Sequence, residues 1–168
     1  DRTPPFKVVL GQVMSKGDRM DYAIQKATEL GVTTIQLLTS ERCEMRLKYD
    51  RDQKKIDHWQ SVAIAACEQC GMNIVPKILA PLRLEDWFNS NLPATKLVLA
   101  PNKDQVDVLN NVSKDLALLI GPEGGLSEAE INAANAVGFE NWCIGSRVLR
   151  TETAPVVALA ILNYRLAE

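Results

Sequence analysis

The sequence predicts an α/β protein with a mostly parallel sheet and helices on both of its faces. Residues 6–14, 19–30 and 32–39 read as strand, helix and strand with short links, an order typical of a parallel βαβ unit. Residues 116–120 form an unbroken apolar run, as expected of a strand that is covered on both faces. Together these patterns indicate an open α/β sheet, in which ligands bind beyond the carboxyl ends of the strands.

Length and composition predict one globular domain. The chain has 168 residues, 46% of them hydrophobic, and a net charge of -2, which allows a sizeable core and excludes a disordered chain. Because the overall charge is slightly negative, any RNA contact requires a local basic patch. We find no bilayer-length apolar run and no signal peptide, so a cytoplasmic protein is expected.

The cysteines predict no metal site. Cys67 and Cys70 form a lone CxxC pair, and Cys43 and Cys143 lie far from it in the sequence. His58 is the single histidine, so a zinc site of two cysteines and two histidines is excluded. Reduced cysteines in a cytosolic protein are the preferred interpretation.

The first half of the chain continues the alternation of strands and helices. Asp18 is the expected N-cap of the first helix. A long helix is predicted from about residue 52 to 70, and a strand over 73–79. Pro76 would interrupt a central ladder, so this strand is expected at an edge or a bulge. Before the long helix and into its start, the basic region 41–55 is either a phosphate contact or a solvated helix face, since aspartates interleave with its cations.

The second half repeats the pattern with shorter elements. We expect a short helix over 84–88, a strand over 96–101 and a brief helix over 106–111. A longer helix runs from Ser127 to the stop at Gly138. The last strand is expected over 139–144.

The loop after the 116–120 strand is the first candidate binding loop. Residues 121–126 contain three glycines, a proline and a glutamate, more glycine than a tight turn requires. Ser127 and Glu130 form a predicted capping box that starts the next helix. The loop lacks the Gly-Lys-Ser/Thr of a phosphate-binding loop. Its glycines favour close backbone contact with a flat or extended ligand, with a purely structural turn as the alternative.

A second candidate loop spans residues 144–155, between the last strand and an apolar helix over 156–162. It is longer and more polar than a plain connection needs, which favours a binding role. Arg150 precedes a helix N-terminus, a position that favours anionic or polar ligand groups. Glu152 has three open interpretations: it neutralises Arg150, acts as a base, or caps the helix.

These two late motifs, over residues 120–127 and 144–154, resemble those of the 16S rRNA uridine-N3 methyltransferases. This family belongs to the SPOUT class of S-adenosylmethionine-dependent RNA methyltransferases. Its other segments are matched along the chain by residues 16–21, 25–31, 40–42 and 68–71. The chain has Met72 where the family usually carries a basic residue.

The resemblance implies a SPOUT-type α/β knot, whose C-terminal part forms a trefoil knot, an exception to the rule against knots. It implies a homodimer that uses S-adenosylmethionine to methylate small-subunit ribosomal RNA. Residues 6–168 would be the catalytic domain and residues 1–5 a linker remnant. The family's N-terminal RNA-binding domain is expected to be absent from this chain.

The resemblance also implies the site residues. Arg150 is the first candidate for stabilising a uridine anion, Arg19 a second that acts across the dimer, and Glu152 the third catalytic candidate. The expected cofactor-binding residues come from three strand ends and from the last loop: Leu99, Ala100, Pro101, Ile120, Gly121, Pro122, Glu123, Gly124, Gly125, Ile144, Gly145, Val148, Leu149, Arg150 and Ala154.

Two alternatives stay open at this point. One is a 2′-O-ribose methyltransferase of the same superfamily. The other is a non-catalytic RNA-binding dimer that kept the fold, although the intact glycines argue against it. A nucleotide-binding α/β protein is disfavoured because no phosphate-loop lysine is present.

Overall fold

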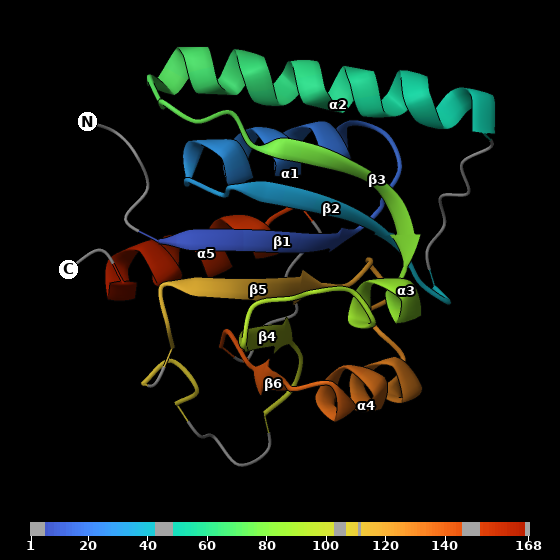
Figure 1. The fold of residues 1–168 in the computed structure, drawn as a ribbon, viewed down its shortest axis with the longest axis vertical. Helices are drawn as coiled ribbons and strands as arrows, with labels where there is room; N and C mark the ends of the chain where they lie inside the picture. Colours follow the sequence, from blue (N-terminus) through green and yellow to red (C-terminus); the bar gives the residue numbers. More distant parts are fainter. Residues whose placement is uncertain (1–5, 43–48, 103–106, 111, 146–151, 167–168) are drawn as a thin grey trace.

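A single parallel sheet organises the molecule (Figure 1). The computed structural model describes residues 6–42, 49–102, 107–110, 112–145 and 152–166. Within these residues, six strands pair in the order β3-β2-β1-β5-β4-β6, and every pairing is parallel. This confirms the predicted α/β class. The elements are β1 (Lys7–Val13), α1 (Asp18–Glu29), β2 (Thr34–Thr39), α2 (Tyr49–Cys70), β3 (Lys77–Arg83), α3 (Leu84–Phe88), β4 (Thr95–Leu99), β5 (Asp115–Ile120), α4 (Glu128–Ala136), β6 (Phe139–Trp142) and α5 (Ala154–Leu166).

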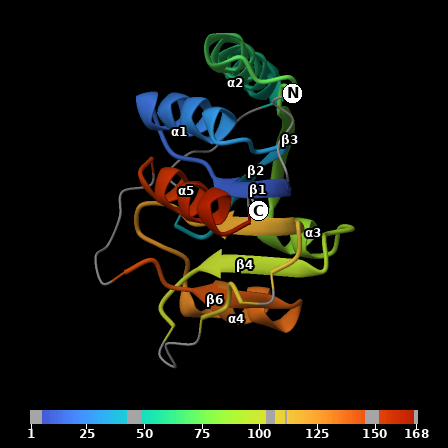
Figure 2. The same cartoon turned by 90° about the vertical axis from the view of Figure 1, so that its left-hand side faces the viewer.

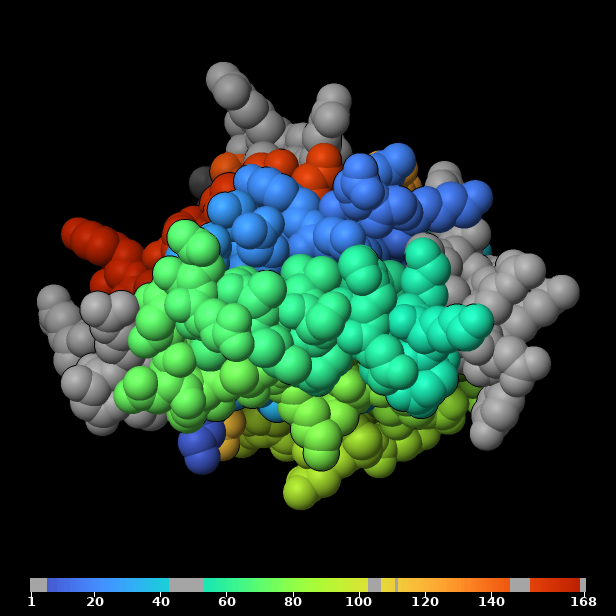
Figure 3. Space-filling model, turned by 90° about the horizontal axis from the view of Figure 1, so that it is seen from above, coloured from blue at the N-terminus to red at the C-terminus, as the bar shows by residue number. Residues whose placement is uncertain are grey.

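Helices lie on both faces of the sheet, as predicted. α1 and α5 pack against each other on one face, whereas α3 lies on the other face, where it contacts β3 and α4 (Figure 2). α2 packs on α1 and β3, and it runs across one whole side of the molecule in Figure 3. With both faces covered, a ligand has access to the sheet at the rim where the parallel strands end.

The core centres on β1 and β5. Every side chain of residues 116–120 is at most 2% exposed, which confirms the interpretation of this apolar run as a doubly covered strand. Burying one leucine side chain in this way contributes about 1.5–3 kcal/mol to stability. Two polar residues interrupt the apolar pattern of the inner strands, Gln12 on β1 and Gln36 on β2, and both are buried.

A glycine in β1 lets α3 approach the sheet closely. A Cβ at Gly11 would lie 2.3 Å from the indole of Trp87, a separation that real side chains do not adopt. The Trp87 ring also contacts Phe139 of β6, with ring centroids 5.6 Å apart. Gly11 therefore allows α3 to pack closely against β1.

The third strand is later in the chain than predicted. β3 begins at Lys77, which pairs with Thr34, so the predicted strand over 73–79 is wrong in its bounds. Pro76 lies before the strand, whereas Pro81 lies inside it, where the register with β2 shifts. The Gln36 side chain donates a hydrogen bond to the carbonyl of Ala80 (2.7 Å) at this irregularity. The predicted edge position is confirmed.

Two smaller predictions are also wrong. Gly17, with φ +67°, occupies the N-cap position of α1, so Asp18 is the first residue of the helix. The Asp18 carboxylate still interacts favourably with the positive end of the helix dipole. Of the helix predicted over 106–111, the described residues 107–110 form a turn in which Leu109 N–H donates to the Asp107 carboxylate. This side-chain bond competes with helix formation.

Candidate functional site

The carboxyl ends of β4, β5 and β6 bring the first group of predicted site residues together. β4 lies between β5 and β6, and Leu99 is in register with Trp142. Beyond the strands, Ala100 N–H donates to the carbonyl of Trp142 (3.2 Å), and the Asn141 side chain donates to the carbonyl of Pro101 (3.2 Å). The segments 99–101, 120–125 and 143–145 therefore leave the sheet at one rim, as predicted.

The glycine loop forms a tight turn. Gly125 N–H donates to the carbonyl of Pro122 (2.8 Å), and Gly125 has a φ of +77°, which disfavours other residues. A Cβ at Gly121 would lie 2.8 Å from Cγ of Leu126. The loop is thus folded close against its own chain, and its shape depends on the glycines at both of its ends.

The start of α4 is capped as predicted. Glu130 N–H donates to the Ser127 hydroxyl (3.1 Å), and Ser127 N–H donates to the Glu130 carboxylate (2.9 Å). The other carboxylate oxygen of Glu130 accepts from the backbone N–H of Glu41 (3.0 Å). One buried side chain therefore caps α4 and also fastens the end of β2 to it, a link that the sequence does not predict.

Two arginines from other parts of the chain contact the glycine loop. Arg42, after β2, donates a hydrogen bond from Nη1 to the carbonyl of Gly124 (2.8 Å). Arg19, in the first turn of α1, forms an ion pair with Glu123. Both contacts are partly exposed, so each contributes at most about 1 kcal/mol to stability. Their effect is to place two guanidinium groups beside the loop, one of them the predicted Arg19.

Two buried polar atoms lie next to this loop. Ser15 and Gln12 are 5% and 1% exposed, and in the part of the chain that the structure describes the Ser15 hydroxyl and the Gln12 carbonyl oxygen lack hydrogen-bond partners. Gln12 is in register with Ile120, directly before the loop, and Ser15 borders a small cavity with Gly124. Such atoms cost about 1–3 kcal/mol each when unsatisfied, so this position favours a polar ligand. In the sequence, this polar position is visible as Gln12, a glutamine inside an otherwise apolar strand.

Only some of the predicted site residues of the last loop lie among the described residues. Ala154 is buried as the first residue of α5, and Glu152 lies half-buried just before it. Val148, Leu149 and Arg150 lie outside the described residues. The start of α5 at Ala154 is two residues earlier than predicted, so Glu152 lies close to the helix N-terminus.

The described cysteines and acidic residues were expected to form no metal centre. Among the residues that the structure describes, no three histidine, cysteine, aspartate or glutamate side chains gather closely enough to bind an ion. Cys67 is buried, and Cys143 is exposed beside the rim, where its thiol donates to the carbonyl of Gly145 (3.0 Å). None of the described helices has the length and low polarity needed to cross a bilayer.

Comparison with known proteins gives a consistent result over nearly the whole chain. Residues 2–163 match the model of an RNA methyltransferase domain. The chain is 38% identical to ribosomal RNA small subunit methyltransferase E of Buchnera aphidicola subsp. Schizaphis graminum, over 98% of this chain and 68% of that protein. It is 31% identical to the Bacillus subtilis protein of the same name, again over 98% and 68%. The chain thus spans about two thirds of the length of these relatives.

Solved structures agree with the sequence relatives. Ribosomal RNA small subunit methyltransferase E from Neisseria gonorrhoeae, bound to S-adenosyl methionine, superposes with a TM-score of 0.85 at 37% identity, over 95% of this chain and 66% of that chain. A Legionella pneumophila protein in complex with the cofactor SAM gives 0.90 at 39% identity, over 98% and 68%. The A. aeolicus TrmH/SpoU tRNA modifying enzyme, at 14% identity and a TM-score of 0.58, shares the fold over 98% of this chain and 77% of that chain.

Proposed function

The chain belongs to the family of ribosomal RNA small subunit methyltransferase E, and we propose that it transfers a methyl group from S-adenosylmethionine to N3 of a uridine in 16S ribosomal RNA. The observation that carries this proposal is the meeting of three strand ends, 99–101, 120–125 and 143–145, at one rim of the sheet. The glycine loop follows β5, next to the end of β4, and both late sequence motifs begin at this rim.

The residues at this rim fit S-adenosylmethionine. Backbone N–H and carbonyl groups beyond the three strands offer hydrogen bonds to an adenine ring. The partly buried Leu99 and Ile144 offer apolar contact, and the unpartnered Ser15 and Gln12 oxygens lie beside the loop for a polar part of a ligand. When bound, the cofactor supplies a methyl group that is already strongly electrophilic. The protein therefore has to hold, orient and dehydrate the reactants.

The acceptor side requires a positive charge. N3–H of uridine is a weak acid, and the nucleophile is its anion, whose charge is shared with O2 and O4. A guanidinium group close to these oxygens stabilises that anion. Arg150 is our first candidate by resemblance to the family, and Arg19 is the candidate that lies against the glycine loop. Glu152 keeps three alternative roles in this proposal: it neutralises Arg150, accepts the N3 proton, or caps α5.

We further propose the homodimer and the C-terminal trefoil knot of the family. The dimer is supported by exposed tyrosines on two helices that pack against each other, α1 and α5: Tyr22 is 43% exposed and Tyr164 is 85% exposed. The knot is proposed from the resemblance of the two late motifs to those of the family, and both motifs begin at the same rim. A dimer through α1 and α5 predicts that Tyr164→Lys shifts the mass measured by light scattering from two chains towards one.

The experiment that tests the function is a methyl-transfer assay. The protein containing this chain is incubated with labelled S-adenosylmethionine and small ribosomal subunits, and the product nucleosides are identified by mass spectrometry. We expect 3-methyluridine, whereas a ribose-methylated nucleoside would favour the 2′-O alternative. Calorimetry with S-adenosylmethionine that shows no heat of binding would favour a non-catalytic RNA binder.

A variant at Arg150 tests the assigned role within that function. Arg150→Ala is expected to keep cofactor binding while losing most turnover. Unchanged turnover would remove Arg150 from the mechanism without affecting the assignment of the reaction. Arg19→Ala, assayed in parallel, shows whether the described guanidinium beside the loop shares this role.

A further inference from the structure

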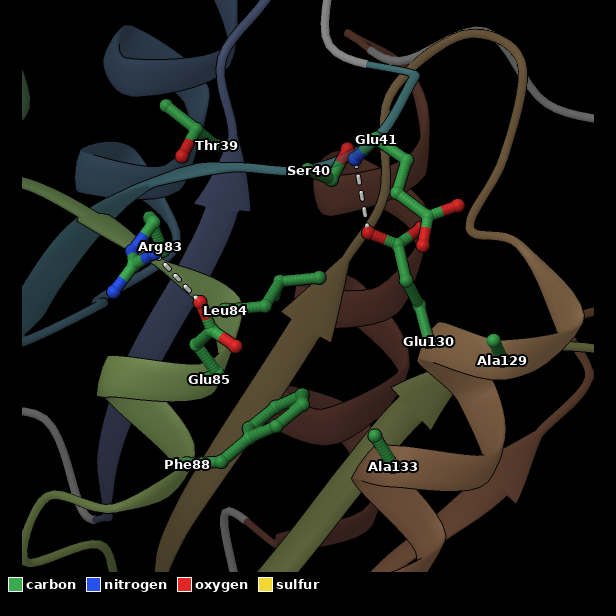
Figure 4. A pocket seen from close by; sticks show the side chains of 10 residues that line it. All are labelled: Thr39, Ser40, Glu41, Arg83, Leu84, Glu85, Phe88, Ala129, Glu130 and Ala133. Carbon is green, nitrogen blue, oxygen red and sulfur yellow. Dashed lines mark hydrogen bonds and ion pairs between the residues drawn. The ribbon is translucent and has the colours of Figure 1, made fainter.

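A larger cavity lies beside the glycine-loop site and is not used by the proposed reaction. It has a volume of about 620 Å³ and opens between α3, α4 and the end of β2 (Figure 4). Sites for small organic ligands usually measure about 300–1,000 Å³. The cavity is therefore large enough for a nucleoside, and its chemistry indicates which kind.

Two facing sides of the cavity carry apolar side chains. Leu84 and Phe88 of α3 point into it from one side, and Ala129 and Ala133 of α4 face them from the other (Figure 4). The Phe88 ring is held by two aromatic neighbours, with centroids 6.2 Å from Trp87 and 5.5 Å from Phe139. A fixed aromatic ring beside small side chains is a suitable surface for stacking a flat ring.

The rest of the cavity lining is polar and acidic. Glu41, Glu85 and Glu130 line it together with a single guanidinium, Arg83. That guanidinium already pairs with Glu85 and Asp86. An excess of carboxylates disfavours a phosphate group and favours a ligand that donates hydrogen bonds.

A buried hydroxyl adds a second polar feature. Within the described part of the chain, the Ser40 hydroxyl oxygen is inaccessible to solvent and has no hydrogen-bond partner. Ser40 lines the cavity at the end of β2, on the side away from Phe88. A stacking surface combined with hydrogen-bond acceptors is the combination expected of a base-reading pocket.

We propose that this cavity binds an unstacked nucleobase of the RNA substrate, one that carries an exocyclic amino group: adenine, cytosine or guanine. The base would stack on Phe88 and donate its amino hydrogens to the glutamate carboxylates. This inference rests on the proposed function. It is linked to the reaction site by the segment Ser40–Arg42, which lines the cavity at one end and holds the carbonyl of Gly124 at the other.

The first test uses cytidine and uridine, which differ at the amino group. The chain is saturated with S-adenosylhomocysteine, so that the cofactor site is filled, and titrated with each nucleoside while the methyl signals of Ala129 and Ala133 are followed by NMR. We expect cytidine to shift both signals with an affinity about tenfold higher than that of uridine. Equal shifts with both nucleosides, or none with either, would overturn the proposal.

The second test uses variants in the methyl-transfer assay. Phe88→Leu keeps an apolar side chain but removes the stacking face, and Glu85→Gln removes a carboxylate that is 66% exposed. We expect each to raise KM for small ribosomal subunits about five- to tenfold, with the dissociation constant for S-adenosylmethionine unchanged. Glu128→Gln is the matched control, because Glu128 is exposed on α4 and does not line the cavity.

The two proposals fail in distinguishable ways. A wild-type protein that methylates ribosomal RNA, with KM unchanged in both cavity variants, refutes the cavity and leaves the function standing. A wild-type protein that methylates no RNA refutes the function, and the cytidine titration then decides the cavity by itself. Thermal unfolding of Phe88→Leu separates a loss of RNA binding from a loss of folding.

Discussion

Replacing Gly121 tests whether the glycine loop has the shape that the cofactor site needs. A Cβ at this position would lie 2.8 Å from Cγ of Leu126 and 3.2 Å from its backbone nitrogen. The first distance is too short for any real contact, and the backbone atom at the second distance cannot rotate away. In Gly121→Ala the turn must therefore open at its first residue, where it leaves β5.

The expected cost follows from this clash. Forcing one additional methyl group into a packed position costs about 1–3 kcal/mol, which lowers the melting temperature of a chain of this size by about 2–12 °C. If about 1.4 kcal/mol of this cost is relieved when the loop opens away from its binding shape, affinity for S-adenosylmethionine falls about tenfold. Calorimetry gives the dissociation constant, and scanning calorimetry gives the melting temperature.

Gly124→Ala is the matched control in the same loop. Its Cβ would lie 3.5 Å from Cδ of Arg42, an ordinary van der Waals contact. We expect its melting temperature to stay close to that of the wild type, so it controls for stability alone, because Gly124 is itself an expected cofactor-binding residue. The reasoning is refuted if Gly121→Ala binds the cofactor as the wild type does, or if the melting temperature of Gly124→Ala falls as far as that of Gly121→Ala.

Three further predictions concern the packing and the thiols. Glu130→Ala removes the acceptor for two backbone N–H groups, at Ser127 and Glu41, so urea unfolding should show a loss of about 1–3 kcal/mol, against about 0.5 kcal/mol or less for the exposed Glu128→Ala. Gly11→Ala drives a methyl group into the Trp87 indole and should cost about 1–3 kcal/mol; unchanged urea unfolding would mean that α3 does not pack as described. Iodoacetamide should label the exposed Cys143 quickly and Cys67 slowly, because burial raises the pKa of the Cys67 thiol and leaves less of the reactive thiolate, with Cys70 and Glu68 adding to the shift. S-adenosylmethionine should slow the labelling of Cys143, measured by peptide mass spectrometry, and no protection would place the cofactor elsewhere.

Local patterns in the sequence were sufficient to predict the central features of the fold. The apolar run 116–120 and the Ser127–Glu130 capping box depend on residues close together in the chain, and the structure confirms both. The gathering of the three strand ends also followed, because parallel strands place their carboxyl ends at one rim.

The features that were missed depend on contacts between distant residues. β3 continues past the predicted end, through Pro81 to Arg83, and the side chain of Gln36 on another strand donates to the carbonyl of Ala80 at the irregularity there. The contacts of Arg42 with Gly124 and of Glu130 with Glu41 join residues more than eighty positions apart. The cavity beside Phe88 likewise forms only where α3 and α4 meet, so no local sequence pattern predicts it.

A crystal structure of this chain with S-adenosylmethionine is the most direct test of the central claim. We predict that the cofactor lies among residues 99–101, 120–125 and 143–145, in contact with the backbone of the glycine loop. Cofactor density away from these three strand ends, for example in the cavity between α3 and α4, would contradict the account.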